Sequence, residues 1–208
     1  MTAEQRREQL IGAARGLFAE YGLGGTTVEE IAAAAQVSKP VVYEHFGGKQ
    51  GLYAAVADHE LRRLDDAVKA AIGAPGLTSR QIIERGALAL LDYIEDCPEG
   101  FRIISRDSSV AGSFASLMSD VARNVEDILC GPLTRRGFDA QLARPFSQAL
   151  VGLVAAAGQV WLDTRQPSKR ELATQLTNLA WNGLLNLEPH PTSSLLDEDQ
   201  PTSETIRS

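Results

Sequence analysis

The chain has 208 residues, of which 44% are hydrophobic and 23% charged, and its net charge is −7 at pH 7. That composition is typical of an ordinary globular protein long enough to enclose a core. The acidic balance excludes a strong general attraction to nucleic acid, because phosphate contacts require cations. The charge is uneven, however: residues 1–53 carry five basic and six acidic side chains, so most of the negative charge lies further along.

The sequence also bears on where the protein is found. Its start, MTAEQRREQL, has no apolar signal core, and the longest apolar stretch, Ala149–Leu162, is interrupted by Gln159 and too short to cross a bilayer. The two cysteines, Cys97 and Cys130, suit a reducing compartment and provide no disulfide framework. We therefore expect a cytoplasmic protein without a membrane partner, and a redox role for either thiol stays open.

Hydrophobic residues recur at helical spacing in almost every segment, which predicts an all-α fold. The first predicted helix has Leu10 and Leu17 on one face and ends at a glycine cluster that begins with Gly22. Thr27 and Glu30 fit a capping box, which predicts the start of a second helix.

A third, short helix is predicted over Lys39–His45, with Ser38 as its N-cap and Pro40 in its first turn. A tight turn at Gln36 separates it from the second helix, and Gly47 ends it. Two short helices joined by a tight turn are the geometry of a helix-turn-helix motif.

Six further helices are predicted over residues 49–72, 79–94, 101–106, 114–136, 140–164 and 172–184. Gly131 and Pro132 are expected to kink or interrupt the fourth of these, and Pro145 to bend or delay the fifth. Beyond Glu188 the chain is rich in Pro, Ser, Thr and acidic residues, which predicts a disordered tail.

In a helix-turn-helix the second short helix lies in the major groove with its N-terminal residues toward the base edges. The Thr27 hydroxyl and the Tyr43 hydroxyl could each meet a phosphate, and Val41 could touch a thymine methyl group. The predicted DNA-contacting set is Thr26, Thr27, Ser38, Lys39, Pro40, Val41, Tyr43, His45 and Lys49.

The same block resembles the DNA-binding region of the TetR family of bacterial regulators. That family has Phe-x-x-x-Gly at the end of its first helix, then Thr-Thr-Val-x-x-Ile-Ala, then Val-Ser-x-x-x-x-Tyr-x-x-Phe-x-x-Lys. This chain has the corresponding residues at Phe18 and Gly22, across Thr26–Ala32, and from Val37 to Lys49. It departs from the family at Gln50 and Gly51, which weakens the start of the next helix but does not touch the contacts.

The resemblance implies a homodimeric transcriptional regulator that binds double-stranded operator DNA and a small-molecule effector, with no enzymatic activity and no cofactor. It divides the chain into a helix-turn-helix domain over 1–48, an effector-binding and dimerisation domain over 49–187, and the tail over 188–208. The fourth helix would be the pivot between DNA and effector.

The resemblance also implies a dimer contact built from the last two helices. Small residues such as Gly152 and Ala156 let helices approach closely, and the two helices look like half of a four-helix bundle. The predicted interface consists of Gly152, Ala156, Trp161, Leu172, Leu176, Leu179, Trp181 and Leu184. A core within one chain stays open as the alternative for these residues.

The predicted effector pocket lies on the middle helices. Its residues are Leu91, Ile94, Phe101, Arg102, Ile104, Arg106, Phe114, Met118, Phe146 and Leu150. Taken singly, each of its apolar residues fits a core position better than a ligand wall, and its arginines could form surface ion pairs instead of meeting an anionic ligand. The stretch from Leu91 to Ile104 is also similar, more loosely, to the effector domain of actinobacterial family members that sense long-chain acyl groups, which favours a lipid-like or acyl effector.

We therefore expect a repressor that leaves its operator when the effector changes the spacing of the two recognition helices. An activator or a ligand-independent regulator is the first alternative, and a helical binding bundle or enzyme without DNA binding is the second. Against the second, His45, His59 and His190 lie far apart, and no metal spacing, nucleophile elbow or phosphate loop occurs. No catalytic residue or metal ligand is predicted.

Overall fold

The computed structural model describes residues 2–106 and 111–192, and the rest of the predicted tail lies outside the described residues. Within these ranges the regular structure is helical, without strands, which confirms the predicted all-α class. The elements are α1 (Ala3–Gly25), α2 (Val28–Ala34), α3 (Lys39–Phe46), α4 (Lys49–Ile72), α5 (Ser79–Asp96), α6 (Pro98–Arg106), α7 (Ala111–Arg135), the short 3-10 helix η1 (Ala140–Leu142), α8 (Ala143–Thr164) and α9 (Lys169–Leu185).

Local capping explains where several helices begin. The Thr27 hydroxyl accepts a hydrogen bond from the Glu30 N–H, and the Glu30 carboxylate accepts one from the Thr27 N–H at 2.8 Å. Thr78 and Gln81 form the same reciprocal pair at the start of α5. These side chains satisfy backbone donors that have no partner inside the helix, so each helix start is fixed by residues only three apart.

The structure differs from the sequence-based expectation at several helix ends and at one proline. At Gly22 the backbone leaves the helical region, with φ of 68° and ψ of 178°, although helical structure resumes as far as Gly25. α6 begins at Pro98 because proline is well tolerated in a first turn, where its missing N–H would have no partner. Pro132 lies inside α7, near its end, and does not interrupt that helix.

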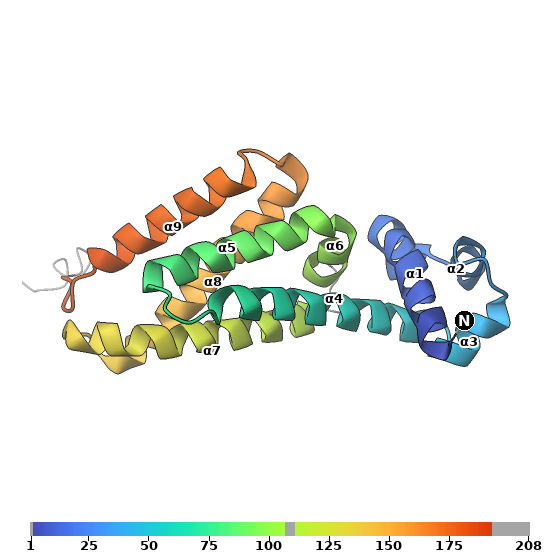
Figure 1. The fold of residues 1–208 in the computed structure, drawn as a ribbon, viewed down its shortest axis with the longest axis horizontal. Coiled ribbons are helices and arrows are strands. Elements are labelled where there is room, and N and C mark those ends of the chain that lie inside the picture. The colour runs from blue at the N-terminus through green and yellow to red at the C-terminus, as the bar shows by residue number, and fades with distance from the viewer. Residues whose placement is uncertain (1, 107–110, 193–208) are drawn as a thin grey trace, which may run out of the picture.

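The helices form two connected groups (Figure 1). α1, α2 and α3 lie at one end, α5 to α9 at the other, and α4 runs from the first group into the second. α4 belongs to both cores, since Leu52 and Val56 pack with α1 to α3 while Leu64 and Val68 pack with residues of α5 to α9. Within the second group α6 lies nearest to α1, and its Ile103 joins the N-terminal core. The two groups are therefore connected through both α4 and α6.

Candidate functional site

The turn between α2 and α3 has the tight geometry that the sequence predicts. The Val37 N–H donates to the Ala32 carbonyl at 2.9 Å, and the Gln36 N–H donates to the Ala33 carbonyl at 3.1 Å. Gln36 has a φ of 55°, the left-handed conformation that often follows a helix end. This turn brings the N-terminus of α3 to the surface directly beside α2.

α3 has one side toward solvent and one toward the core. Ser38, Lys39 and Pro40 are exposed and the Tyr43 side chain is 55% exposed, whereas Val42 is fully buried. Ser38 occupies the N-cap position but makes no side-chain capping hydrogen bond, so its hydroxyl does not hold the helix. The arrangement is a short rod whose first turn faces outward, which is what entry into a DNA groove requires.

Two cations of the predicted DNA-contacting set have partners within the chain. The Lys39 ammonium pairs with the carboxylate of Glu29 on α2 and thereby lowers the pKa of that exposed group. The Lys49 ammonium donates to the Thr26 carbonyl at 2.8 Å and so ties the start of α4 to the corner between α1 and α2. Any phosphate contact by either lysine has to share or replace these bonds.

Thr26 is a correction to the predicted DNA-contacting set. Its side chain is fully buried, and its hydroxyl donates to the Gly22 carbonyl at 2.9 Å. The hydroxyl therefore closes the broken end of α1, and the prediction that this side chain meets DNA is wrong. Thr27 is exposed, with its hydroxyl used in the α2 cap, while Val41 and His45 are half-buried.

Arg7 is a residue of this site that the sequence did not reveal. Its guanidinium donates to the His45 carbonyl at 3.0 Å and lies 4.4 Å from the centroid of the Phe46 ring. A cation at the C-terminus of a helix is favourable both for the orphan carbonyl and for the helix dipole. No local pattern links Arg7 to α3, because the two are 38 residues apart in the chain.

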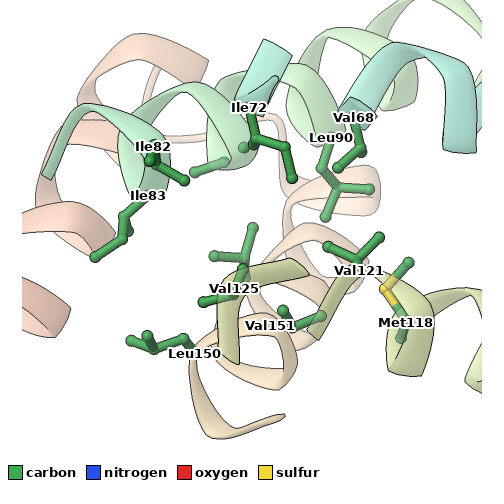
Figure 2. A pocket seen from close by; sticks show the side chains of 13 residues that line it. Val68, Ile72, Ile82, Ile83, Leu90, Met118, Val121, Val125, Leu150 and Val151 are labelled. Carbon is green, nitrogen blue, oxygen red and sulfur yellow. The ribbon is translucent and has the colours of Figure 1, made fainter. Parts of the chain in front are cut away.

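A second candidate site is an apolar cavity among α4, α5, α7 and α8 (Figure 2). Its empty volume is about 590 Å³, including the part that opens to solvent. The lining residues are Val68, Ile72, Ile82, Ile83, Gly86, Ala87, Leu90, Met118, Val121, Val125, Leu150, Val151 and Val154. None of these described residues has a polar side chain, so the cavity suits an apolar ligand.

Met118 and Leu150 are the predicted pocket residues that line this cavity. The others do not, and their placement corrects the prediction. Leu91, Ile94, Phe101, Ile104 and Phe114 fill the closed core beside the cavity. Phe146 packs on a third cluster formed by the end of α7. Arg102 approaches Asp163 at 4.0 Å, and the side chain of Arg106 lies outside the described residues.

The last two helices expose apolar side chains that nothing in the described chain covers. Gly152, Ala156 and Val160 are exposed at every fourth position of α8, which places them on one face, and the Val160 side chain is 66% exposed. Leu179 on α9 is 62% exposed. An exposed row of small and apolar residues on a helix is typical of a helix–helix contact with another chain.

Trp161 corrects the predicted dimer interface. Its side chain is 3% exposed, and its indole N–H donates to the Pro167 carbonyl at 2.7 Å, so it is part of the core of its own chain. Leu176 is likewise buried. Leu172 packs partly against the same core, while Trp181 and Leu184 line a small groove between α9 and the end of α7.

The stretch Ala140–Thr164 is long and apolar enough to span a membrane by length and composition, and it is the single such stretch among the described residues. This span is longer than Ala149–Leu162, the apolar stretch that the sequence marks as too short to cross a bilayer. The core helix of a soluble bundle has the same length and composition. Only 28% of its most apolar window is buried, and Gly152, Ala156 and Val160 account for part of the exposed remainder.

The side chains that could bind a metal ion are scattered over the part of the chain that the structure describes. No three His, Cys, Asp or Glu side chains come together there as a group able to hold a metal ion. His45 lies on α3, and His59 of α4 faces Glu8 with 4.0 Å between Nδ1 and the carboxylate.

The chain matches two family profiles that together span most of its length. Residues 10–56 match the profile of the bacterial regulatory proteins of the TetR family. Residues 67–194 match the profile of the tetracyclin repressor-like C-terminal domain. The first match contains the turn between α2 and α3, and the second contains the whole cavity.

Individual proteins that are similar to this chain are also transcriptional regulators. The chain is 31% identical over 184 residues to the transcriptional activator FasR of Mycolicibacterium smegmatis, covering 87% of this chain and 84% of that protein. It is 27% identical over 208 residues to a helix-turn-helix-type regulator of Mycobacterium tuberculosis, covering 90% of this chain and 86% of that one. A solved TetR-like regulator from Rhodococcus, 26% identical, covers 88% of this chain and 97% of its own with a TM-score of 0.70. The chain thus belongs to the TetR family of bacterial regulatory proteins and is a DNA-binding transcriptional regulator.

Proposed function

We propose that this regulator binds operator DNA as a homodimer through α3 and responds to a small, mainly apolar effector held in the cavity among α4, α5, α7 and α8. The functional division would fall near residue 48, with α4 as the pivot because it packs in both cores. A cytoplasmic location follows from an operator on chromosomal DNA.

The outward side of α3 supports the DNA contacts. Ser38, Lys39 and Pro40 present the helix start to a major groove, and Tyr43 is placed to reach a phosphate one turn later. Thr27, Val41, His45 and Lys49 would act from the rim, where each is less exposed or already bonded within the chain.

The uncovered faces of α8 and α9 support a symmetric dimer. In a twofold contact the same face of each subunit meets its copy, so Gly152 and Ala156 would let two α8 helices approach closely. Val160 and Leu179 would add apolar area at that contact. Paired half-sites would require this dimer to hold its two copies of α3 on one side of the molecule.

The single observation that carries the effector proposal is the purely apolar wall of the cavity. Each methylene buried there gains about 0.8 kcal/mol, whereas a buried charge would find no partner among the lining side chains. A long acyl chain fits this requirement, with its polar end held outside the cavity. Small polar metabolites do not fit it.

The sign of regulation has two candidates. We propose repression, in which the filled cavity favours a spacing of the two α3 helices that does not match the operator. Activation is the second candidate because FasR, which is 31% identical, is named as an activator. Mapping the bound site relative to the promoter separates the two, since a repressor overlaps the polymerase site and an activator lies upstream.

A cavity-filling variant tests the effector proposal. Val125→Phe places a ring inside the cavity, and Asn124→Phe places the same ring on the exposed side of α7 as the matched control. The probes are palmitoyl-coenzyme A and butyryl-coenzyme A, added while the anisotropy of a labelled promoter fragment is followed. The wild-type chain and Asn124→Phe should respond to the long chain only, and Val125→Phe should bind DNA without responding. A full response of Val125→Phe, or no difference between the two probes, would contradict the proposal.

A further inference from the structure

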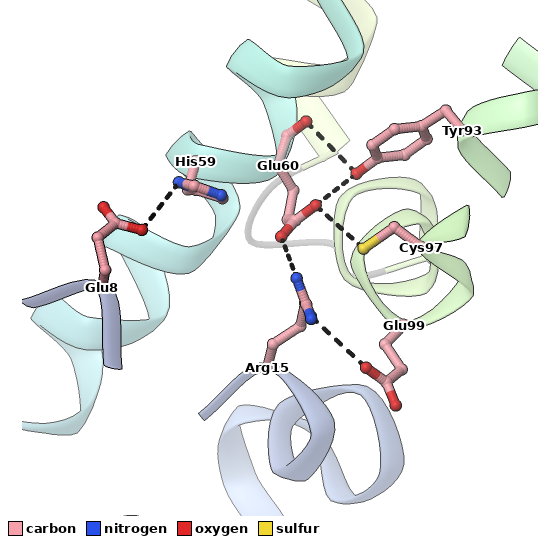
Figure 3. A network of polar contacts seen from close by, with 7 residues as sticks. All are labelled: Glu8, Arg15, His59, Glu60, Tyr93, Cys97 and Glu99. Carbon is pink, nitrogen blue, oxygen red and sulfur yellow. Dashed lines mark hydrogen bonds and ion pairs between the residues drawn. The ribbon is translucent and has the colours of Figure 1, made fainter. Parts of the chain in front are cut away.

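A buried carboxylate joins the two groups of helices (Figure 3). Glu60 lies on α4 with a fully buried side chain, at the level where α1, α5 and α6 meet. One carboxylate oxygen, Oε1, lies 3.2 Å from the Arg15 guanidinium of α1. The other, Oε2, accepts the Tyr93 hydroxyl at 2.8 Å and the Cys97 thiol at 3.3 Å.

The partners of Glu60 come from both functional halves of the molecule. Arg15 belongs to α1, whose Leu10 and Phe18 pack in the core of the DNA-binding helices. Tyr93 lies on α5, and Cys97 caps its C-terminal end, three and seven residues beyond Leu90 in the cavity wall. The carboxylate is thus the shared acceptor of one donor from the DNA-binding half and two from the effector half.

The donors are held in the protonated form that these bonds need. Burial and the nearby Glu60 carboxylate raise the pKa of both Tyr93 and Cys97, so each remains a neutral donor at physiological pH. Arg15 also approaches Glu99 of α6 at 3.5 Å, so the same cation touches a third helix. A buried charge with fewer partners raises the free energy of the folded state. The loss of any one of these bonds should therefore destabilise the present arrangement of the helices.

The packing around the carboxylate leaves no room for a side chain at Gly100 of α6. A Cβ atom at this position would lie 2.4 Å from Glu60 Oε2 and 2.9 Å from the Cys97 sulfur. Real side chains do not approach this closely, so a methyl group at residue 100 has to displace the carboxylate or the thiol. The glycine is what lets α6 close over the network.

We propose that the Glu60 carboxylate is the group that couples α5 of the effector half to α1 of the DNA-binding half. A shift of α5 when the cavity fills would weaken the bonds from Tyr93 and Cys97 and change how the carboxylate holds Arg15. Glu60 is on this view a positioning residue that sets the placement of α1, and through α1 that of α3. The part concerning cavity occupancy rests on the proposed function; the coupling of α5 to α1 does not.

The first test uses amide hydrogen exchange, which needs neither DNA nor effector. Gly100→Ala displaces the carboxylate without removing a polar group, and Tyr93→Phe removes one donor on α5. Both should raise the exchange rate of α1 amides severalfold. The matched control is Gly183→Ala on α9, whose Cβ would have no other atom within 4 Å, and it should leave the exchange rate of α1 at the wild-type value.

The second test is a double-mutant cycle of Arg15→Gln and Tyr93→Phe, read as affinity for a promoter fragment that the wild-type chain binds. These side chains bond to opposite oxygens of Glu60, so their effects should be non-additive by at least about twofold. With Glu60→Gln in all four proteins the non-additivity should shrink. Additive effects, or unchanged α1 exchange in both Gly100→Ala and Tyr93→Phe, would overturn the coupling. Failure of the wild-type chain to bind DNA or an acyl probe would instead refute the proposed function, and the exchange result would still decide the coupling.

Discussion

At the scale of single residues, the two lysines of the predicted DNA-contacting set already have partners within the chain. Lys39 pairs with Glu29, and Lys49 is bonded to the Thr26 carbonyl. We therefore expect the net attraction to the phosphate backbone to be small, with neutral hydroxyls carrying more of the contact than in a strongly basic domain.

Tyr43→Phe tests the role of the most exposed hydroxyl on α3. Losing one hydrogen bond to a phosphate, worth about 1 kcal/mol, should weaken DNA binding about fivefold. Because phosphate contacts carry no base information, the loss should be equal for specific and unrelated sequences. Fluorescence anisotropy on both kinds of fragment measures it. The control is Tyr21→Phe, an exposed tyrosine on α1, and an equal effect there would contradict the assignment.

Glu29→Gln should strengthen DNA binding, because it removes one negative charge from the predicted interface and releases Lys39 from its ion pair. The expected gain is a few-fold at low salt, and the dependence of log affinity on log salt should steepen by about one unit. Titrations at several salt concentrations measure both quantities. A weaker complex would mean that the ion pair holds Lys39 in its binding position.

The burial of individual side chains was the feature that the sequence predicted least well. Thr26 stands beside Thr27 in the motif, yet one hydroxyl is fully buried and the other exposed, because Gly22 breaks α1 and leaves a carbonyl for Thr26. Trp161 was predicted to lie in the dimer interface, but its indole N–H donates to the Pro167 carbonyl of the same chain. Both outcomes depend on a backbone turn several residues away, which periodicity does not encode.

At the scale of elements, the helix starts were predictable because their determinants are local. The capping box of Thr27 and the glycine after α3 act within three or four residues. The cavity was not predictable in the same way, since it is a gap where faces of α4, α5, α7 and α8 fail to meet. The sequence marks a residue as apolar without saying whether it closes a core or borders a space.

Gly47 fixes the end of α3, and its substitution tests how far that end matters. The residue has a φ of 69°, so Gly47→Ala should cost about 1–2 kcal/mol in the free energy of unfolding. Urea denaturation measures this loss, and DNA affinity should fall with it because the C-terminal turn of α3 loosens. Gly12→Ala, at an exposed position in α1 with nothing within 4 Å, should be neutral or stabilising. Destabilisation of both variants to the same degree would contradict the reasoning.

At the scale of the whole molecule, α4 spans from the DNA-binding end to the cavity, so a change at one end has a continuous path to the other (Figure 1). Its two halves pack in different cores, with Glu60 between them. α8 lies with α5, α7 and α9 at the end of the molecule opposite α3 (Figure 1). A dimer formed there leaves both reading helices accessible.

Ala156→Arg tests that dimer. Two arginines facing each other across a twofold contact combine steric overlap with like-charge repulsion, so the variant should sediment as a monomer at micromolar concentration. Thr174→Arg adds the same side chain on a different exposed side of α9 and should remain dimeric. Sedimentation velocity distinguishes the two masses. Monomer formation by both variants, or by neither, would place the contact elsewhere.

The most direct measurement is selection of genomic DNA fragments by the purified wild-type chain, followed by sequencing of what it retains. The expected result is a short paired motif whose two halves are centred about 34–36 Å apart, or a multiple of that distance, along the duplex. Tyr43→Phe should retain the same motif more weakly. Recovery of no common sequence at low salt, or of a motif without paired halves, would contradict DNA reading by two copies of α3.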